Sequence, residues 1–282
     1  MTRLVRLDHS VIVAVHEPLR RVNADLVELL EGLSEHDWEQ RTVHPQRSVK
    51  DLVAHLLHGS LRRVTGIRDR YQRPGPEIQS AEDLVAFIQQ DNREFMVGMR
   101  RISPRILIEL IRTYDEELVA LFARMDPQAR GLGVVWAGEW SSPNWFDIAR
   151  EYTEKWHHQQ QIRDATGRPP LYAADLLSPV LETFARGFPF AFRDLEFPEG
   201  TSLSIQTTGY VSCSWTLVRE PAHWSLWCGM DPGSSTLLSL PAEVAWRIWT
   251  KSMDHDEARE QISIKGDPSF VDPFLSFVAI MA

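Results

Sequence analysis

The segment from Trp145 to Asp164, with the sequence WFDIAREYTEKWHHQQQIRD, indicates a long helix with two different faces. Glu154 and His158 are four residues apart, so they lie one above the other on one face of the helix. An apolar stripe follows the helical repeat on the opposite face at Trp145, Ala149, Tyr152 and Trp156. One face can therefore pack into an apolar core while the other points into a polar cavity.

Four more helices are predicted before this segment, because apolar residues recur at helical spacing and serine residues stand at helix-capping positions. We expect these helices at about residues 17–31, 48–70, 80–99 and 103–125, with a short turn or helical hook at 34–38. A glycine-rich loop at 126–142 follows them, and the helix of the quoted segment ends at Gly167. Long helices with short connections predict an up-down four-helix bundle.

The second half of the chain has a different pattern. Short β-like runs, separated by glycine and proline turns, replace the helical spacing near residue 170. We expect strands at about 202–207, 211–218, 224–228, 236–240 and 261–265, and helices at about 177–192, 241–250 and 268–280. The sequence thus predicts a helical bundle over residues 1–170, a linker at 168–175, and a smaller α+β domain over residues 175–282.

Composition and charge exclude several classes of protein. With 43% hydrophobic and 24% charged residues, the chain is not largely disordered. The net charge of -9 disfavours nucleic-acid binding. We find neither a run of about 18 apolar residues nor the pattern of a signal peptide. The cysteines, Cys213 and Cys228, are too few for a disulfide framework or a four-cysteine zinc site, and we expect them to be packed small residues in a cytoplasmic protein.

Histidine and glutamate residues on two of the predicted helices suggest a metal site. A carboxylate and an imidazole at the spacing of Glu154 and His158 can share one divalent metal ion. On the helix at 48–70, His55 lies on the flank of the apolar stripe, whereas His58 and His157 point away from the proposed ligands. Two histidines and one glutamate suit a catalytic zinc, nickel or iron ion. A solvated pair on the helix surface is the alternative.

Two stretches together resemble a known family. The sequence SVKDLVAHL at 48–56, with the segment from Glu154 to Arg163, resembles the N-terminal domain of mycothiol-dependent maleylpyruvate isomerases. That domain belongs to the wider DinB-like family of metal-binding four-helix bundles. The sequences EHDW at 35–38 and QQQIRDATGRP at 159–169 fit the same family, and the resemblance covers about residues 15–170. The sequences AWR at 245–247 and IKGD at 264–267 resemble the sterol-carrier-like C-terminal domain of these isomerases.

The resemblance implies roles for particular residues. It implies that His55, Glu154 and His158 bind the metal, with glutamate as the middle ligand as in the isomerase branch of the family. It also implies that an arginine of the C-terminal domain takes part in the reaction. Arg247 is the candidate, and a surface arginine of a helix is the alternative interpretation. The cofactors implied are a divalent metal, Zn²⁺ first with Ni²⁺ or Fe²⁺ as alternatives, and a low-molecular-weight thiol as cosubstrate.

Three functions remain open. The first is a metal-dependent isomerase or S-transferase, in which a thiolate adds to a small electrophilic, anionic substrate. The second is a hydrolase that uses a metal-bound water, and the third is a non-enzymatic protein that binds a metal or a small ligand. We expect a small-molecule substrate and a thiol as partners, no nucleic acid and no membrane, and a monomer or homodimer.

Overall fold

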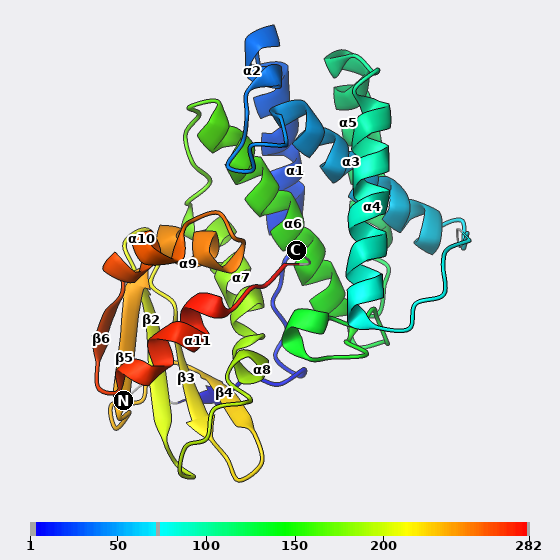
Figure 1. Cartoon of the computed structure of the whole chain (residues 1–282). Coiled ribbons are helices and arrows are strands. Elements are labelled where there is room, and N and C mark those ends of the chain that lie inside the picture. The colour runs from blue at the N-terminus through cyan, green and yellow to red at the C-terminus, as the bar shows by residue number, and fades with distance from the viewer. Residues whose placement is uncertain (1–3, 72–73, 281–282) are drawn as a thin grey trace. The chain divides into compact units, whose positions relative to one another are not determined.

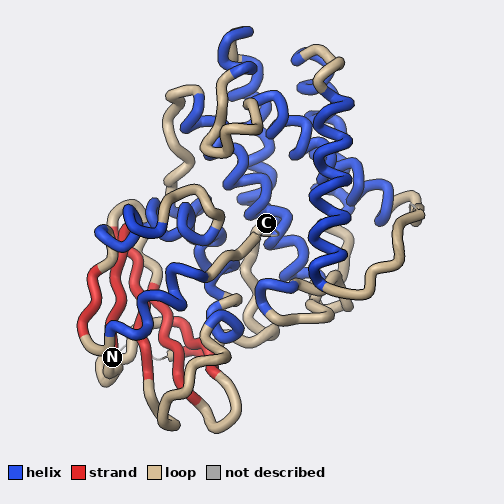
Figure 2. The backbone as a smooth tube through the Cα atoms, viewed as in Figure 1, coloured by secondary structure: helices blue, strands red, loops and turns tan. Residues whose placement is uncertain are grey.

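The computed structural model describes residues 4–71 and 74–280, and the chain forms two compact units (Figures 1 and 2). The helical unit comprises Val15–Pro127 and Glu151–Leu171. The sheet unit comprises the described residues up to Ala14, the segment Gln128–Arg150, and the described residues from Tyr172 onward. Within the described ranges, no helix is long and apolar enough to cross a membrane.

The helical unit contains the helices that the sequence predicts. They are α1 (His16–Glu31), α2 (Glu35–Glu39), α3 (Val49–Ile67), α4 (Ala81–Met99), α5 (Pro104–Phe122) and the part of α6 (Asn144–Ala165) from Glu151 onward. Serine side chains accept hydrogen bonds from backbone N–H groups at the starts of four of these helices, at Ser34, Ser48, Ser80 and Ser103. These bonds satisfy donors that a helix leaves unpaired in its first turn, which is why the helices begin there.

The helical unit has an apolar core around α3. This helix packs against α4 and α5, and α1 packs against α5. The core is built from buried side chains that recur at helical spacing, among them Leu26, Leu30, Trp38, Leu52, Val53, Leu56, Leu107, Ile111 and Ile162. Helix α6 also contributes buried polar side chains to the interior of the unit, and these are described with the candidate site.

The sheet unit contains a mixed sheet of six strands in the order β1-β4-β3-β2-β5-β6. The strands are β1 (Val5–Arg6), β2 (Ser202–Thr208), β3 (Ser214–Arg219), β4 (Trp224–Cys228), β5 (Thr236–Pro241) and β6 (Ser263–Lys265). Only the pair β2 and β5 is parallel among these strands. The helices are α7 (Ala174–Ala185), α8 (Phe188–Ala191), α9 (Ala242–Trp249), α10 (His255–Glu260) and α11 (Val271–Ser276), with short 3₁₀ turns η1 (Val135–Ala137) and η2 (Pro268–Phe270).

The predicted fold class, a helical bundle followed by an α+β domain, is confirmed, but the two units differ from the predicted ranges 1–170 and 175–282. The N-terminal segment groups with the sheet unit because β1 pairs with β4 and because Trp145 Nε1 donates a hydrogen bond to His9 O at 3.0 Å. Arg186 also donates to the carbonyl oxygens of Asp8 and Val11. A two-residue strand has no periodicity of its own, so the sequence alone does not reveal this pairing.

Some predicted elements of the second half have other bounds. The helix expected at 177–192 is divided into α7 and α8, and the last helix ends at Ser276 rather than near residue 280. Strand β3 begins at Ser214 rather than at 211 because the preceding residues form a turn, in which Thr207 N donates to Cys213 O and Gly209 has a φ of 82°. Helix α10 was not expected.

Candidate metal centre

Helices α3 and α6 position the candidate ligands, and both are fixed by local contacts. Ser48 and Asp51 form a reciprocal capping box at the start of α3, and Arg100 donates two hydrogen bonds to the Asp51 carboxylate, at 2.8 and 2.9 Å. On α6, Trp156 is fully buried and its Nε1 donates to Leu171 O at 3.2 Å. These contacts fix the rotation of each helix and therefore the direction in which its polar residues point.

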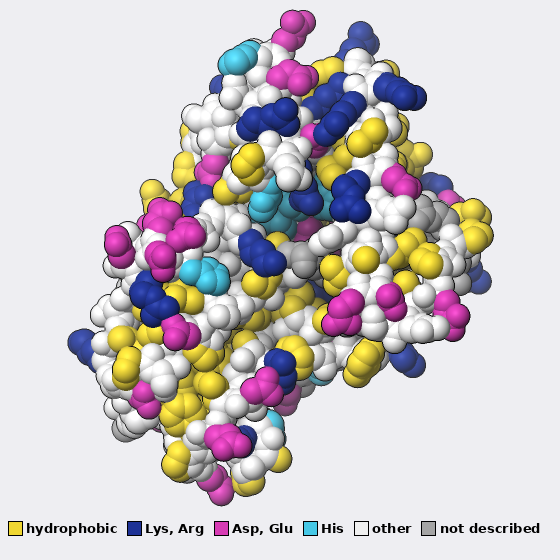
Figure 3. All heavy atoms as spheres, in the orientation of Figure 1, with side chains coloured by type: hydrophobic (Ala, Val, Ile, Leu, Met, Phe, Trp, Pro, Cys, Tyr) yellow, Lys and Arg dark blue, Asp and Glu magenta, His cyan; other side chains and the backbone are white. Residues whose placement is uncertain are grey.

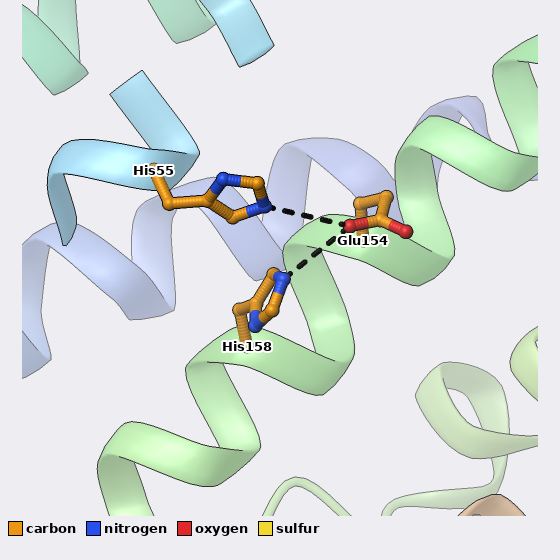
Figure 4. Close-up of side chains that lie close together, drawn as sticks. All are labelled: His55, Glu154 and His158. Atoms are coloured by element: carbon orange, nitrogen blue, oxygen red, sulfur yellow. Dashed lines mark ion pairs between the residues drawn. The ribbon is translucent and has the colours of Figure 1, made fainter. Parts of the chain in front are cut away.

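The structure brings His55, Glu154 and His158 together, as the sequence predicts (Figure 4). One ligand atom from each residue lies within 4.8 Å of the others. Glu154 Oε2 is 3.4 Å from His158 Nε2 and 3.9 Å from His55 Nε2. The centres of the two imidazole rings are 4.7 Å apart. Neighbouring ligands of a tetrahedral zinc ion lie roughly 3.4 Å apart, given bonds of about 2.0–2.1 Å. These residues therefore fit a zinc ion with only small side-chain movements.

The protonation states of the three residues also suit a metal ion. Burial lowers the pKa of His55 and of His158, although the Glu154 carboxylate acts in the opposite direction. Burial alone would raise the pKa of Glu154, but the neighbouring imidazoles of His157, His158 and His55 lower it well below its ordinary value. Two neutral imidazoles and one ionised carboxylate are the forms that bind a metal.

Gln161 orients His158 and was not predicted from the sequence. Its amide Oε1 lies 2.8 Å from His158 Nδ1, and a carbonyl oxygen only accepts hydrogen bonds. His158 Nδ1 therefore carries the proton, and the lone pair of Nε2 faces Glu154, where a metal would bind. The spacing of three residues on one helix, which places Gln161 beside His158, is the sequence signal that could have identified it.

The other two histidines of the predicted set lie outside the three-residue group. The ring of His58 stacks on Phe95 at 4.5 Å, and its Nδ1 is 2.9 Å from Asn92 Oδ1. His58 thus points away from the apolar stripe of α3, as expected, but α4 covers it. His157 Nδ1 donates to Thr153 O at 2.8 Å, and burial lowers the pKa of His157 to about 3.

A buried ion pair, also missed in the sequence, holds α6 against α3 and α5. Lys155 Nζ lies 2.7 Å from Asp115 Oδ1, and the two side chains are 1% and 2% exposed. Lys155 also donates to Ser60 Oγ at 2.6 Å and to Leu56 O at 3.2 Å. Because Lys155 follows Glu154 directly in the chain, the pair contributes to the orientation of the candidate ligand.

Arg247 lies on α9 in the sheet unit, on the helix that the sequence predicts for it. Its Nη2 donates to the Tyr172 hydroxyl at 3.2 Å, and its guanidinium lies 4.5 Å from the centre of the Trp246 ring. These contacts hold the guanidinium in one place and leave it charged. Its part in a reaction stays a prediction.

The cysteines have no features of nucleophiles. Burial raises the pKa of Cys213 to about 11 and also raises the pKa of Cys228. A thiol is reactive as the thiolate, so neither residue is activated at neutral pH.

Comparison with known protein families identifies the N-terminal part of the chain. The family model of the mycothiol maleylpyruvate isomerase N-terminal domain matches residues 19–163, about half of the chain. The chain belongs to this family. The matched range contains all three candidate ligands of the metal centre.

Solved structures show that the likeness to the mycothiol-dependent maleylpyruvate isomerase extends over both units. A crystal structure of that isomerase has a TM-score of 0.54 and 12% sequence identity, and the match covers 91% of this chain and 94% of that one. A mutant of the same isomerase gives a TM-score of 0.55 with the same identity and coverage. At this identity the likeness shows the fold. No curated protein matches the chain.

Proposed function

We propose that this protein is a divalent-metal-dependent enzyme that activates a low-molecular-weight thiol, as an isomerase or S-transferase of a small electrophilic, anionic substrate. The observation that carries the proposal is the group of His55, Glu154 and His158, whose positions and protonation states suit a divalent metal. Membership in the maleylpyruvate isomerase family favours an isomerase-type reaction, with mycothiol as the thiol. Zn²⁺ is the first candidate for two nitrogen ligands and one oxygen ligand, and Ni²⁺ and Fe²⁺ accept the same donors.

A bound divalent metal would lower the pKa of a coordinated thiol, so that a thiolate exists near neutral pH. The protein's residues prepare the place for it. His55 and His158 supply neutral nitrogen donors, and Gln161 keeps the Nδ1 proton of His158 away from the metal side. The Glu154 side chain is 38% exposed, whereas that of His158 is 6% exposed, so the group is accessible at its carboxylate.

We assign to Arg247 the stabilisation of negative charge that develops on the substrate. A guanidinium is charged at every pH at which the protein is folded, and it pairs well with a carboxylate or an enolate oxygen. The Tyr172 hydroxyl and the Trp246 ring restrict its movement, which reduces the entropy lost when it binds an anion.

The test uses the full-length protein, freed of metal with a chelator and reloaded with Zn²⁺. We expect one tightly bound zinc ion per chain, measured by elemental analysis, and turnover of maleylpyruvate only when zinc and mycothiol are both present. Turnover with zinc but without thiol would support the hydrolase instead. Zinc binding with no turnover of maleylpyruvate or of other electrophiles, in the presence of thiol, would contradict the enzymatic proposal.

A second measurement tests Arg247. Arg247→Ala should keep the zinc stoichiometry and lower turnover by about a hundredfold, the order of effect of removing one group that stabilises an anionic transition state. Arg259→Ala, which removes an exposed arginine of the same unit that pairs with Asp272, is the matched control. Equal turnover in the two variants would remove Arg247 from the mechanism.

A further inference from the structure

A groove lies between helices α1 and α5 of the helical unit. It has a volume of about 540 Å³, and every residue of its lining belongs to one of these two helices. Ala24 on α1 and Ala120 on α5 are part of the lining, and their methyl groups leave space that longer side chains would fill. Sites for small molecules have volumes of about 300–1,000 Å³, so the groove is large enough for one.

The groove is separate from the candidate metal centre. None of the three candidate ligands belongs to its lining, which contains no histidine among the residues that the structure describes. Figure 3 shows a different hollow, in which histidine side chains gather beside Lys or Arg side chains. A molecule that binds in the groove is therefore recognised by other residues, those of α1 and α5.

An amide without a partner belongs to the lining of the groove. Asn23 is the polar member of a buried stripe on α1 that otherwise consists of leucine and valine. The residue is 8% exposed, and neither Oδ1 nor Nδ2 has a hydrogen-bond partner in the described part of the chain. A buried polar group costs free energy unless a hydrogen bond compensates for it. Packing alone therefore does not explain Asn23, and a ligand in the groove can supply the missing partner.

The amide of Asn23 needs only a small movement to meet such a ligand. Its oxygen and nitrogen atoms are both covered by the surrounding chain. However, the terminal torsion of an asparagine side chain has a broad range of accessible angles. A turn about this bond changes the direction of both atoms without moving the helix.

Acidic side chains outnumber basic ones in the lining by four to two. Two of the acidic residues already have partners, because Arg112 pairs with Glu31 and Lys155 pairs with Asp115 Oδ1. The other oxygen of the Asp115 carboxylate, Oδ2, is buried and has no hydrogen-bond partner within the described ranges.

Two carboxylates of the lining remain available to a ligand. Glu28 and Glu116 are exposed, and neither forms a hydrogen bond or an ion pair with the residues that the structure describes. The charge of Glu28 also acts on Arg163, so Glu116 is the more available of the two. Arg20 is the remaining guanidinium of the lining. One positive charge against two negative charges favours a cationic ligand.

We propose that the groove between α1 and α5 binds a small organic cation, composed of an ammonium group and a compact apolar body. The ammonium group donates hydrogen bonds to the carboxylate of Glu116 and to Oδ1 of Asn23, since a charged donor forms strong bonds with such acceptors. The apolar body packs against Val27, Val119 and the alanine side chains of the lining. The inference does not depend on the proposed function, because none of these residues belongs to the metal centre.

The test measures the binding of phenethylammonium to the full-length protein by two-dimensional NMR spectroscopy, with phenethyl alcohol as the matched neutral compound. We expect phenethylammonium to shift the backbone amide signals of α1 and α5 and the side-chain amide signals of Asn23. The alcohol should bind about tenfold more weakly, because it lacks the charge. Shifts confined to other helices, equal binding of the two compounds, or no binding of phenethylammonium would overturn the proposal.

Variants of the lining locate the bound cation. Glu116→Gln should weaken the binding of phenethylammonium by about tenfold, since a charge-assisted hydrogen bond is lost. Ala120→Leu should abolish binding, because leucine fills the groove and is a good helix former at an exposed position. The control Glu82→Gln removes the same charge from an exposed position of α4 outside the lining and should leave binding unchanged. Wild-type affinity in either Glu116→Gln or Ala120→Leu would overturn the site.

Asn23→Leu separates ligand binding from a structural role. Because the Asn23 amide has no hydrogen-bond partner in the described chain, leucine should keep or raise the melting temperature of the ligand-free protein. The affinity for phenethylammonium should fall by about fivefold, since the ammonium group loses one acceptor. A lower melting temperature with unchanged affinity would show that Asn23 serves the fold alone and would contradict its part in the proposal.

Discussion

The interiors of the two units differ in chemistry. The sheet unit is filled with aromatic side chains that contact one another, including Trp215, Trp224, Trp249, Phe184, Phe188, Phe192, Phe270 and Phe274. The helical unit instead buries polar and charged side chains along α6 and opposite it, namely Lys155, His157, His158, Gln159, Gln160, Gln161 and Asp115. Aromatic packing stabilises a fold, whereas buried polar groups cost free energy unless they are paired. The chemistry of the protein is therefore expected in the helical unit.

The titratable groups of the two units support this division. In the sheet unit, burial raises the pKa of Glu182 and of Cys213, so both are shifted toward their neutral forms. In the helical unit, Glu154 is kept ionised beside two neutral histidines. Strongly perturbed groups that share a specific charge partner are candidates for a functional site, and the group around Glu154 meets this description.

The largest expected effect comes from removing a ligand of the helical unit. His158→Ala should weaken zinc binding by about a thousandfold or more, because only His55 and Glu154 remain to hold the ion. The measurement is competition for zinc with a chelator of known affinity. His58→Ala and His157→Ala should keep one zinc ion per chain, since neither side chain belongs to the three-residue group. An equal loss in all three variants would show that the ligands are assigned wrongly.

A second prediction concerns the buried ion pair. Asp115→Ala should lower the free energy of unfolding of the helical unit by about 3–5 kcal/mol, because it leaves Lys155 buried without its counter-ion. Urea denaturation of the metal-free protein, followed by far-ultraviolet circular dichroism, measures this change. The double variant Asp115→Leu, Lys155→Met should recover most of the loss, since an apolar pair needs no counter-ion. A cost below about 1 kcal/mol for Asp115→Ala would contradict this account.

Much of the fold could be predicted because its signals are local. Serine caps and helical spacing locate the helices of the bundle, and the strand at 224–228 has the observed bounds of β4. The pairing of β1 with β4 could not be predicted, because Val5 and its partner Cys228 lie far apart in the sequence and two residues carry no pattern. Helix α10 has six residues, too few for an apolar helical repeat, and could not be predicted either.

The candidate site shows the same limit. Helical geometry relates Glu154 to His158 and the apolar stripe of α3 makes His55 a candidate, and the resemblance to the isomerase family then selected the three residues together. The partner of Lys155 depends on which helices pack together, so the sequence did not reveal it.

A third prediction tests the inert character of the sheet unit. With a pKa of about 11, Cys213 is almost entirely a thiol at pH 8, so iodoacetamide should alkylate it roughly a hundredfold more slowly than an ordinary cysteine. Because the thiolate is the reactive form, the rate should rise about tenfold per pH unit until the pH approaches the pKa. The variant Cys228→Ser isolates Cys213 for this measurement by mass spectrometry, and Cys213→Ser isolates the exposed Cys228 as the comparison. Rapid alkylation of Cys213 at pH 7 would instead make Cys213 a candidate nucleophile. The sheet unit would then also contain a reactive group, as the helical unit is expected to.

The smallest expected effect concerns the residue that orients a ligand without touching the metal. Gln161→Leu should weaken zinc binding by about tenfold, because His158 Nδ1 loses its acceptor and the imidazole is no longer held with Nε2 toward Glu154. Gln161→Glu keeps an acceptor of nearly the same shape and adds a negative charge, so its zinc affinity should equal or exceed that of the wild type. The same chelator competition used for His158→Ala measures both variants.

The order of the zinc affinities of these two variants decides whether Gln161 acts by packing or by hydrogen bonding. If Gln161 acted only by filling space, leucine would replace it well, and glutamate, a charge in a buried position, would be the more harmful change. If Gln161 acts by accepting the hydrogen bond from His158, the order is reversed, because the carboxylate accepts this bond more strongly than the amide and makes the imidazole a better donor to the metal. Weaker zinc binding in Gln161→Glu than in Gln161→Leu would therefore assign this buried glutamine to packing. The residues that determine zinc affinity in the helical unit would then be the three ligands, without Gln161.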